Sequence, residues 1–195
     1  MKKVFVVLSI ILLSVFANGQ DWSVSVTPTA NFLFTYHITM GNAPQSPMIG
    51  VSSSLQYEFI NEKKVSFGMG IGYQYGSVEI SPNYLGPAVE IPSFTETANL
   101  ITVSFMTVFK LRNQFYLSLD PLLDFQLNSE SPDAIENQTG LGLSFAAGKK
   151  IFRGESFYIR IEPRVWIHGI VPFNYNHQPR RLTVVGVNIG VGLRK

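Results

Sequence analysis

The chain has 195 residues, of which 46% are apolar and 14% are charged, compared with roughly 25% charged in an average soluble domain. A net charge of +2, without a run of basic residues interleaved with aromatics, gives no basis for nucleic-acid binding. The sequence contains no cysteine, which excludes disulfides, thiolate nucleophiles and Cys-ligated metals. These properties predict one exported domain that is not held together by oxidation.

The first 19 residues have the features of a secretory signal peptide. Lys2 and Lys3 form a basic start, residues 4–16 are continuously apolar, and residues 17–19 provide small residues before a cleavage site. The alternative is a membrane anchor, but the apolar run is shorter than the roughly 20 residues that a spanning helix needs. We expect cleavage before Gln20 and a mature chain of residues 20–195.

Eight later segments alternate between apolar residues and polar or small ones, which is the side-chain period of a β-strand. The expected strands are residues 21–38, 48–59, 65–75, 94–111, 115–127, 141–148, 157–170 and 182–193. In the third segment one row is apolar or aromatic and the other row is mostly glycine without charge. A surface strand of a soluble protein would carry charged residues there. Glycine suits a crowded interior, so the aromatic row is expected to face an apolar exterior.

The connections between these segments alternate in length. The long ones are residues 39–47, 76–93, 128–140 and 171–180, and the short ones are residues 61–64, 112–114 and 149–156. Outer-membrane barrels have an even strand number, from 8 upward, with short periplasmic turns and longer outer loops. The pattern therefore predicts an all-β fold, an eight-stranded antiparallel up-and-down transmembrane β-barrel.

Aromatic residues gather near both ends of the outward rows, as expected for the two interfaces of a bilayer. Those near the short turns are Trp22, Phe59, Phe109, Phe115 and Phe157, and those near the long loops are Phe34, Tyr36, Tyr73, Tyr75 and Phe125. Pro28, Pro121 and Pro163 fall on outward rows, and we interpret them as β-bulges because proline removes a ladder donor.

From residue 22 through residue 194 the chain resembles the small outer-membrane β-barrel proteins of Gram-negative bacteria, most of all the porin-family barrels of the Bacteroidota group. Residues 68–75, 115–121 and 186–193 carry the resemblance. It implies a cell outer-membrane location, contact with outer-membrane lipid and lipopolysaccharide, insertion by the barrel-assembly machinery, a monomer and no cofactor. Such barrels often end on an aromatic residue that the assembly machinery reads, whereas this chain ends in Leu193-Arg194-Lys195.

The inward rows predict a polar network in the lumen. Its members are Glu58, Lys110, Asp120, Asp124, Arg160, Glu162, Arg164 and His168. The fifth and seventh strands lie two spacings apart, roughly 9–10 Å, with a row of small residues between them. Arg160 and Arg164 are therefore expected to reach toward Asp120 and Asp124. We interpret the network as structural ion pairs that plug the lumen, because an unpaired buried charge is costly; a proton- or ion-conducting path is the alternative.

The predicted role is non-enzymatic: structural, anchoring or surface interaction. Three alternatives remain: an accessory barrel of a secretion or envelope-assembly system, an outer-membrane lipid-modifying enzyme, and a soluble secreted barrel of lipocalin type. The enzyme would need an outward nucleophile and base, whereas His37 and His168 are expected to face inward and His177 lies in a predicted loop. The histidine spacing predicts no metal site. A loop at residues 173–181 has Arg180 and Arg181 that could contact lipopolysaccharide phosphates, with a solvated rim as the preferred interpretation.

Overall fold

Almost all of the regular structure is β-strand. The computed structural model describes residues 21–35, 45–61, 63–81, 92–127, 137–173 and 180–194. The strands are β1 Asp21–Thr35, β2 Gln45–Asn61, β3 Val65–Ile80, β4 Phe94–Lys110, β5 Phe115–Gln126, β6 Gly140–Arg153, β7 Phe157–Pro172 and β8 Arg180–Arg194. A 3₁₀ turn, η1 Arg112–Gln114, connects β4 to β5. Among these residues no helix is long and apolar enough to cross a membrane. The predicted leader lies outside the described residues, as do residues 36–38 of the first predicted strand.

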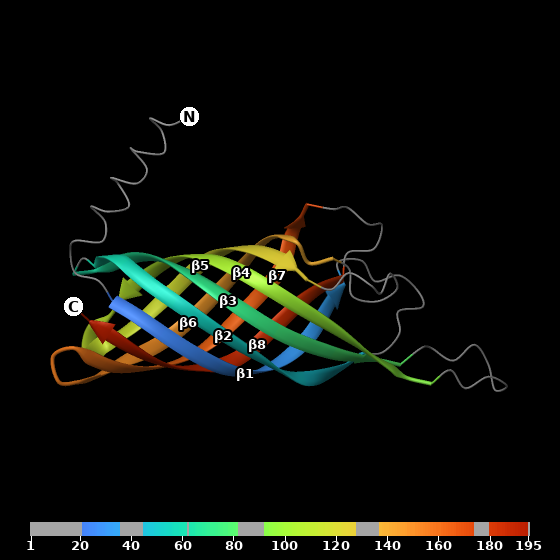
Figure 1. Cartoon of the computed structure of the whole chain (residues 1–195), viewed down its shortest axis with the longest axis horizontal. Helices are drawn as coiled ribbons and strands as arrows, with labels where there is room; N and C mark the ends of the chain where they lie inside the picture. The colour runs from blue at the N-terminus through green and yellow to red at the C-terminus, as the bar shows by residue number, and fades with distance from the viewer. Residues whose placement is uncertain are drawn as a thin grey trace, which may run out of the picture.

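Each strand pairs antiparallel with the next strand in the sequence, and β8 pairs with β1, so the sheet closes into a barrel (Figure 1). The closing ladder runs from Asp21 opposite Arg194 to Thr35 opposite Arg180. Closure leaves no sheet edge with unpaired backbone N–H and C=O groups. The predicted eight-stranded antiparallel up-and-down barrel is therefore confirmed. We call the end where β2, β4 and β6 terminate the turn end, and the opposite end the loop end.

The two faces of the strands differ as the alternation predicts. On β1, the inward residues Asp21, Ser23 and Ser25 are 3–4% exposed, whereas the outward Val24 and Val26 are 53% and 52% exposed. The same alternation follows every strand, and each of the eight has large apolar side chains on its outward row. The chain thus buries its polar row and exposes its apolar row, the reverse of a soluble sheet.

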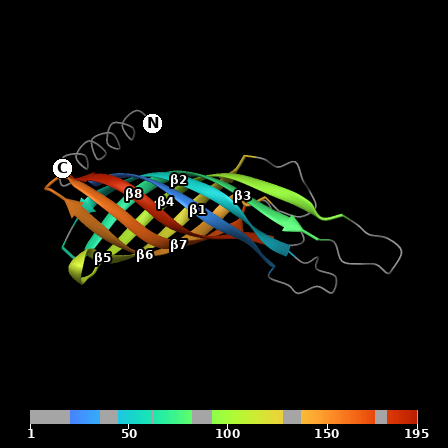
Figure 2. The ribbon, with the colours of Figure 1, turned by 90° about the horizontal axis from the view of Figure 1, so that it is seen from below.

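Several strands are longer than the sequence pattern predicts. Residues 76–80, expected to be loop, continue β3 and pair with β4 as far as Ile80 opposite Phe94. Residues 149–153, expected to be a connection, continue β6 and pair with β7. Figure 2 shows β3 and β4 running past their neighbours at the loop end. In both corrections the alternation continues beyond the predicted limit, with Val78, Ile80 and Lys150 on the buried row.

The β3–β4 extension differs from the middle of the barrel. Its inward row contains the fully buried apolar residues Val78 and Ala98, and the buried Glu96 lies opposite Val78. Its outward row is polar and consists of Glu79, Thr95, Thr97 and Asn99. The last aromatic residues of the outward apolar row on β3 are Tyr73 and Tyr75, and the Tyr73 hydroxyl donates to Asn99 Oδ1 at 2.7 Å. The apolar outward surface therefore stops before the strands do.

The three prolines do not form the predicted bulges. Each pairs in register with one neighbour: Pro28 with Val51, Pro121 with Leu143 and Pro163 with Val187. On its other side, each proline and an adjacent residue lack a partner in the neighbouring strand. The register between the two strands is the same before and after this gap. A missing N–H removes a hydrogen bond without requiring an extra residue. The register shifts lie elsewhere, at two places on β2–β3 and between Leu141 and Leu143 of β6–β7.

Replacing Gly140 with alanine is expected to destabilise the barrel. A Cβ at this position would lie 2.3 Å from the Val171 carbonyl oxygen and 2.8 Å from Pro172 Cα. Both atoms belong to backbone, so β7 must move, at a cost of about 1–3 kcal/mol as for other overpacked sites. Gly72→Ala is the matched control, because its nearest atom is 3.2 Å away. Urea unfolding in detergent micelles measures both; equal midpoints would contradict the predicted close approach.

Candidate functional site

The centre of the barrel interior is occupied by a group of ion pairs. Arg164 lies between two carboxylates, with Nη1 2.5 Å from Asp120 Oδ2 and Nη2 3.0 Å from Glu162 Oε1. It also donates to Ser144 Oγ at 2.9 Å and to Ser118 Oγ at 3.3 Å. All of these side chains are buried. We call Asp120, Arg160, Glu162 and Arg164 the central network; its two positive and two negative charges balance.

Glu162 is the most connected carboxylate of the central network. Its Oε1 accepts from Arg164 Nε at 3.1 Å and from Asn188 Nδ2 at 2.5 Å. Its Oε2 accepts from the Tyr116 hydroxyl. Arg160 Nη2 lies 3.8 Å from Glu162, and Arg160 Nη1 donates to Gln56. The network therefore links β2, β5, β7 and β8 across the lumen.

A second polar group lies nearer the loop end. His168 Nδ1 is 3.0 Å from Asp124 Oδ2, and His168 Nε2 is 3.1 Å from Gln74 Oε1. Asp124 Oδ1 accepts from the Thr102 hydroxyl at 2.9 Å. The His168 and Asp124 side chains are fully buried. The imidazole is therefore a bridge between β3, β5 and β7, with no access to a substrate from outside the barrel.

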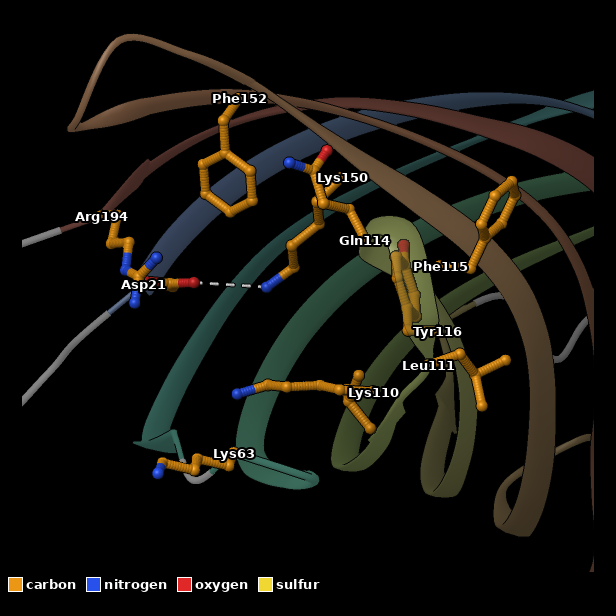
Figure 3. Close-up of a pocket in the computed structure, with 11 residues that line it drawn as sticks. Asp21, Lys63, Lys110, Leu111, Gln114, Phe115, Tyr116, Lys150, Phe152 and Arg194 are labelled. Carbon is orange, nitrogen blue, oxygen red and sulfur yellow. Dashed lines mark hydrogen bonds and ion pairs between the residues drawn. The ribbon is translucent and has the colours of Figure 1, made fainter.

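A third polar group lies at the turn end. Lys150 Nζ is 3.3 Å from Asp21 Oδ2 and 2.5 Å from Glu58 Oε1. Figure 3 shows the Lys150 side chain reaching across the opening toward Asp21. This ion triad joins β6 to β1 and β2, on the far side of the barrel.

An apolar cluster fills the interior toward the loop end. It consists of Val78, Ala98, Leu100, Leu122, Trp166, Leu182 and Val184, with Leu33 packed against it. Next to it, Leu122 and Trp166 also line a polar cavity of only about 30 Å³, bounded on the other side by Arg164 and Asn188. A space of that size holds about two water molecules. The middle of the lumen is therefore filled by side chains.

The eight predicted lumen residues all lie on β2, β4, β5 and β7, but they divide into separate groups. Asp120, Arg160, Glu162 and Arg164 meet in the central network. Asp124 and His168 pair with each other, and Glu58 joins Lys150. Lys110 is half-buried in the wall of a cavity at the turn end. Arg160, expected to reach toward Asp120 and Asp124, makes its direct contacts with Gln56 and Glu162.

Sequence reasoning missed several members of these groups. Lys150 was placed in a turn, although its parity with Gly148 extends the inward row. Asp21 begins the inward row of β1, and Tyr116 and Asn188 are buried on the inward rows of β5 and β8. Tyr116 and Asn188 are uncharged, so a search of the sequence for charged inward residues does not find them. Within the described residues, no group of three or more His, Asp or Glu side chains is arranged to hold a metal ion.

Several solved structures of outer-membrane proteins are similar to this chain. The outer membrane protein OprG from Pseudomonas aeruginosa aligns with a TM-score of 0.51 and 11% identity, covering 91% of this chain and 96% of OprG. Neisserial surface protein A aligns with a TM-score of 0.49 and 11% identity over 89% of this chain and 98% of that protein. Ail of Yersinia pestis aligns with a TM-score of 0.42 and 11% identity, over 91% of this chain and 98% of Ail. No protein-family model and no curated protein matches the sequence. At 11% identity the OprG alignment supports the barrel fold that the strand pairing shows, and it carries no information on role.

Proposed function

We propose that this chain is an integral β-barrel of the bacterial outer membrane. The observation that carries the proposal is the continuous exposed apolar surface. Every strand contributes large outward apolar side chains, including Trp22, Leu55, Ile71, Phe105 and Phe145. Soluble monomers rarely expose apolar patches larger than a few hundred Å². A lipid bilayer is the environment in which such a surface is stable, and closure satisfies the backbone groups that lipid cannot.

The limits of the apolar surface support a bilayer with the loop end outside the cell. Beyond Tyr73 and Tyr75 the β3–β4 extension turns polar on its outer face. Short turns at the other end match the periplasmic side of outer-membrane barrels. In this proposal the outer surface contacts lipid and lipopolysaccharide, the barrel-assembly machinery inserts the chain, and the barrel is a monomer.

Cell fractionation tests this location. The protein is expected in the outer-membrane fraction, and it should migrate on a denaturing gel at different positions before and after boiling. Folded barrels resist the detergent until heated, because their strands are closed on themselves. Recovery of the protein from the soluble periplasm would support the lipocalin-type alternative instead.

We further propose that the barrel has a non-enzymatic role in structure, anchoring or surface interaction, and that its lumen is plugged. The central network and the apolar cluster support closure of the lumen, because together they fill its middle and its loop end. The buried position of His168 supports a role without acid–base catalysis at the surface. Membership of the porin-family barrels of the Bacteroidota group rests on the sequence resemblance.

A planar-bilayer recording tests the plugged lumen. The purified barrel is expected to show no long-lived, large-conductance openings, because the cavity between Gln56 and Trp166 holds only about 30 Å³. A 16-stranded porin inserted in the same bilayer is the positive control, since such barrels leave an aqueous channel. Stable porin-sized steps from this protein would contradict closure.

A further inference from the structure

The turn end of the barrel contains a cavity of about 380 Å³. Cationic side chains from four parts of the chain line it: Lys63 from the β2–β3 turn, Lys110 from β4, Lys150 from β6 and Arg194 from β8. Figure 3 shows these four side chains gathered on one side of the opening. The volume lies within the range of small-molecule sites, roughly 300–1,000 Å³.

The positive charge of this wall exceeds the nearby negative charge. Among the described residues, Asp21 is the acidic side chain that lines the cavity, and Glu58 meets Lys150 beside it. In the part of the chain that the structure describes, four cations against these two carboxylates leave an excess of two positive charges. A partly enclosed space with charge of one sign concentrates ions of the other sign. The charge balance therefore favours a doubly negative ligand.

Apolar and aromatic side chains also line the cavity, with Phe152 beside Arg194 and three more on the opposite side. Leu111, Phe115 and Tyr116 lie on this side (Figure 3). The Tyr116 ring lies so close to Gly148 that a Cβ there would meet its Cζ at 2.6 Å, and its hydroxyl donates to Glu162. Tyr116 thus separates the cavity from the central network. The cavity combines a cationic wall with an apolar wall and leads to no open channel.

The β4–β5 turn supplies one more polar side chain in an uncommon backbone conformation. Asn113 and Gln114 have φ angles of 61° and 67°. Residues other than glycine seldom adopt this region, and asparagine does so more readily than glutamine. The conformation places Gln114 in the cavity wall, where its side-chain amide adds a hydrogen-bond donor. Strained conformations of this kind are frequent at ligand sites.

We propose that this cavity binds a phosphate monoester group attached to an apolar molecule. Such a group has close to two negative charges at neutral pH and three strong acceptor oxygens. It matches the excess charge of the wall and the ammonium and guanidinium donors of Lys63 and Arg194. Leu111 and Phe115 contact the apolar part. A water-soluble monoester and the headgroup of a phosphatidic acid molecule both present this chemistry.

The test is an NMR titration of the ¹⁵N-labelled barrel in maltoside micelles, in which the amide chemical shifts are measured. In one arm phenyl phosphate is added, and in the other arm the micelles are doped with phosphatidic acid, with phosphatidylcholine as the lipid control. Saturable shifts at Gln114, Phe115 and Arg194 are expected. Shifts with phenyl phosphate identify a soluble monoester as sufficient, and shifts with phosphatidic acid alone identify the lipid headgroup; both support the site. No shifts in either arm would overturn it.

Two variants in the same turn distinguish binding in the cavity from attraction to the positive charge of the surface in general. Lys63→Gln removes a cation that lines the cavity, whereas Lys64→Gln removes the same charge from the adjacent exposed residue, which is not in the wall. Lys63→Gln is expected to weaken binding about tenfold, the loss typical of a charged hydrogen bond. Lys64→Gln should bind like the unmodified protein. Equal weakening in both variants would show diffuse attraction and would contradict a defined site.

Discussion

Arg164→Ala is expected to cause a loss of stability of about 3–5 kcal/mol, the usual cost of removing one member of a buried ion pair. The substitution leaves Asp120 and Glu162 without the guanidinium that lies 2.5 Å and 3.0 Å from them. Both carboxylates are fully buried and lose a charged hydrogen-bond donor at a site away from bulk water. The temperature at which the heat-modifiable gel shift occurs, or the urea midpoint in micelles, measures the effect.

Two further variants show that the effect belongs to the network. Arg153→Ala removes an exposed arginine next to the β6–β7 turn and should change stability by at most about 0.5 kcal/mol. The double variant Arg164→Met with Asp120→Leu removes both partners of the shortest pair. It should recover part of the loss, because replacing both members with apolar residues avoids an unpaired charge. If Arg164→Ala and Arg153→Ala unfold at the same temperature or urea concentration, the proposed structural role of the central network is wrong.

Val187→Arg is expected to block stable insertion into the membrane. Val187 is an outward residue near the middle of β8, 46% exposed, and it lies beside the outward Pro163 of β7. An arginine on the lipid face of a barrel costs about 2–4 kcal/mol near the bilayer midplane. On a soluble barrel the same change would place a charge in water at little cost. The amount of heat-modifiable protein in the outer-membrane fraction is the measurement.

Thr95→Arg is the matched control for Val187→Arg. Thr95 also faces outward and is exposed, but it lies on the β3–β4 extension, opposite Glu79. This position is beyond the apolar surface, so an arginine there should be tolerated. Normal insertion of both variants would contradict the bilayer proposal. Failure of both would move the membrane boundary outward, past the extension.

The faces of the strands could be predicted from the sequence because a side-chain period of 2 depends on the local chain alone. The glycine row of β3 and the apolar row of β8 were assigned to the correct faces, and the closed barrel was confirmed. Strand ends were predicted less well. Gly76 and the prolines that follow predict a loop at residues 76–80, whereas pairing with β4 outweighs that local preference.

Partners across the lumen could not be predicted in the same way. Which inward residues meet depends on how far each strand is displaced along its neighbours when the barrel closes. That displacement places Arg164 beside Asp120 and Arg160 beside Gln56, although both arginines lie on the same row of β7. It also places Asp124 beside His168. Buried neutral partners such as Tyr116 and Asn188 depend on the same geometry.

The ion triad at the turn end connects residues that are very far apart in the sequence. Asp21 and Lys150 are separated by 129 positions, and Glu58 and Lys150 by 92. These contacts form only after β6 has been made and the ends of the sheet have joined, so they cannot assist early folding. Chains dominated by such non-local pairings fold slowly, because the entropy of closing long loops is lost before the contacts form. The ion pairs of the triad should therefore form at the last step of barrel assembly. Before that step, the side chains of Asp21, Glu58 and Lys150 must remain hydrated.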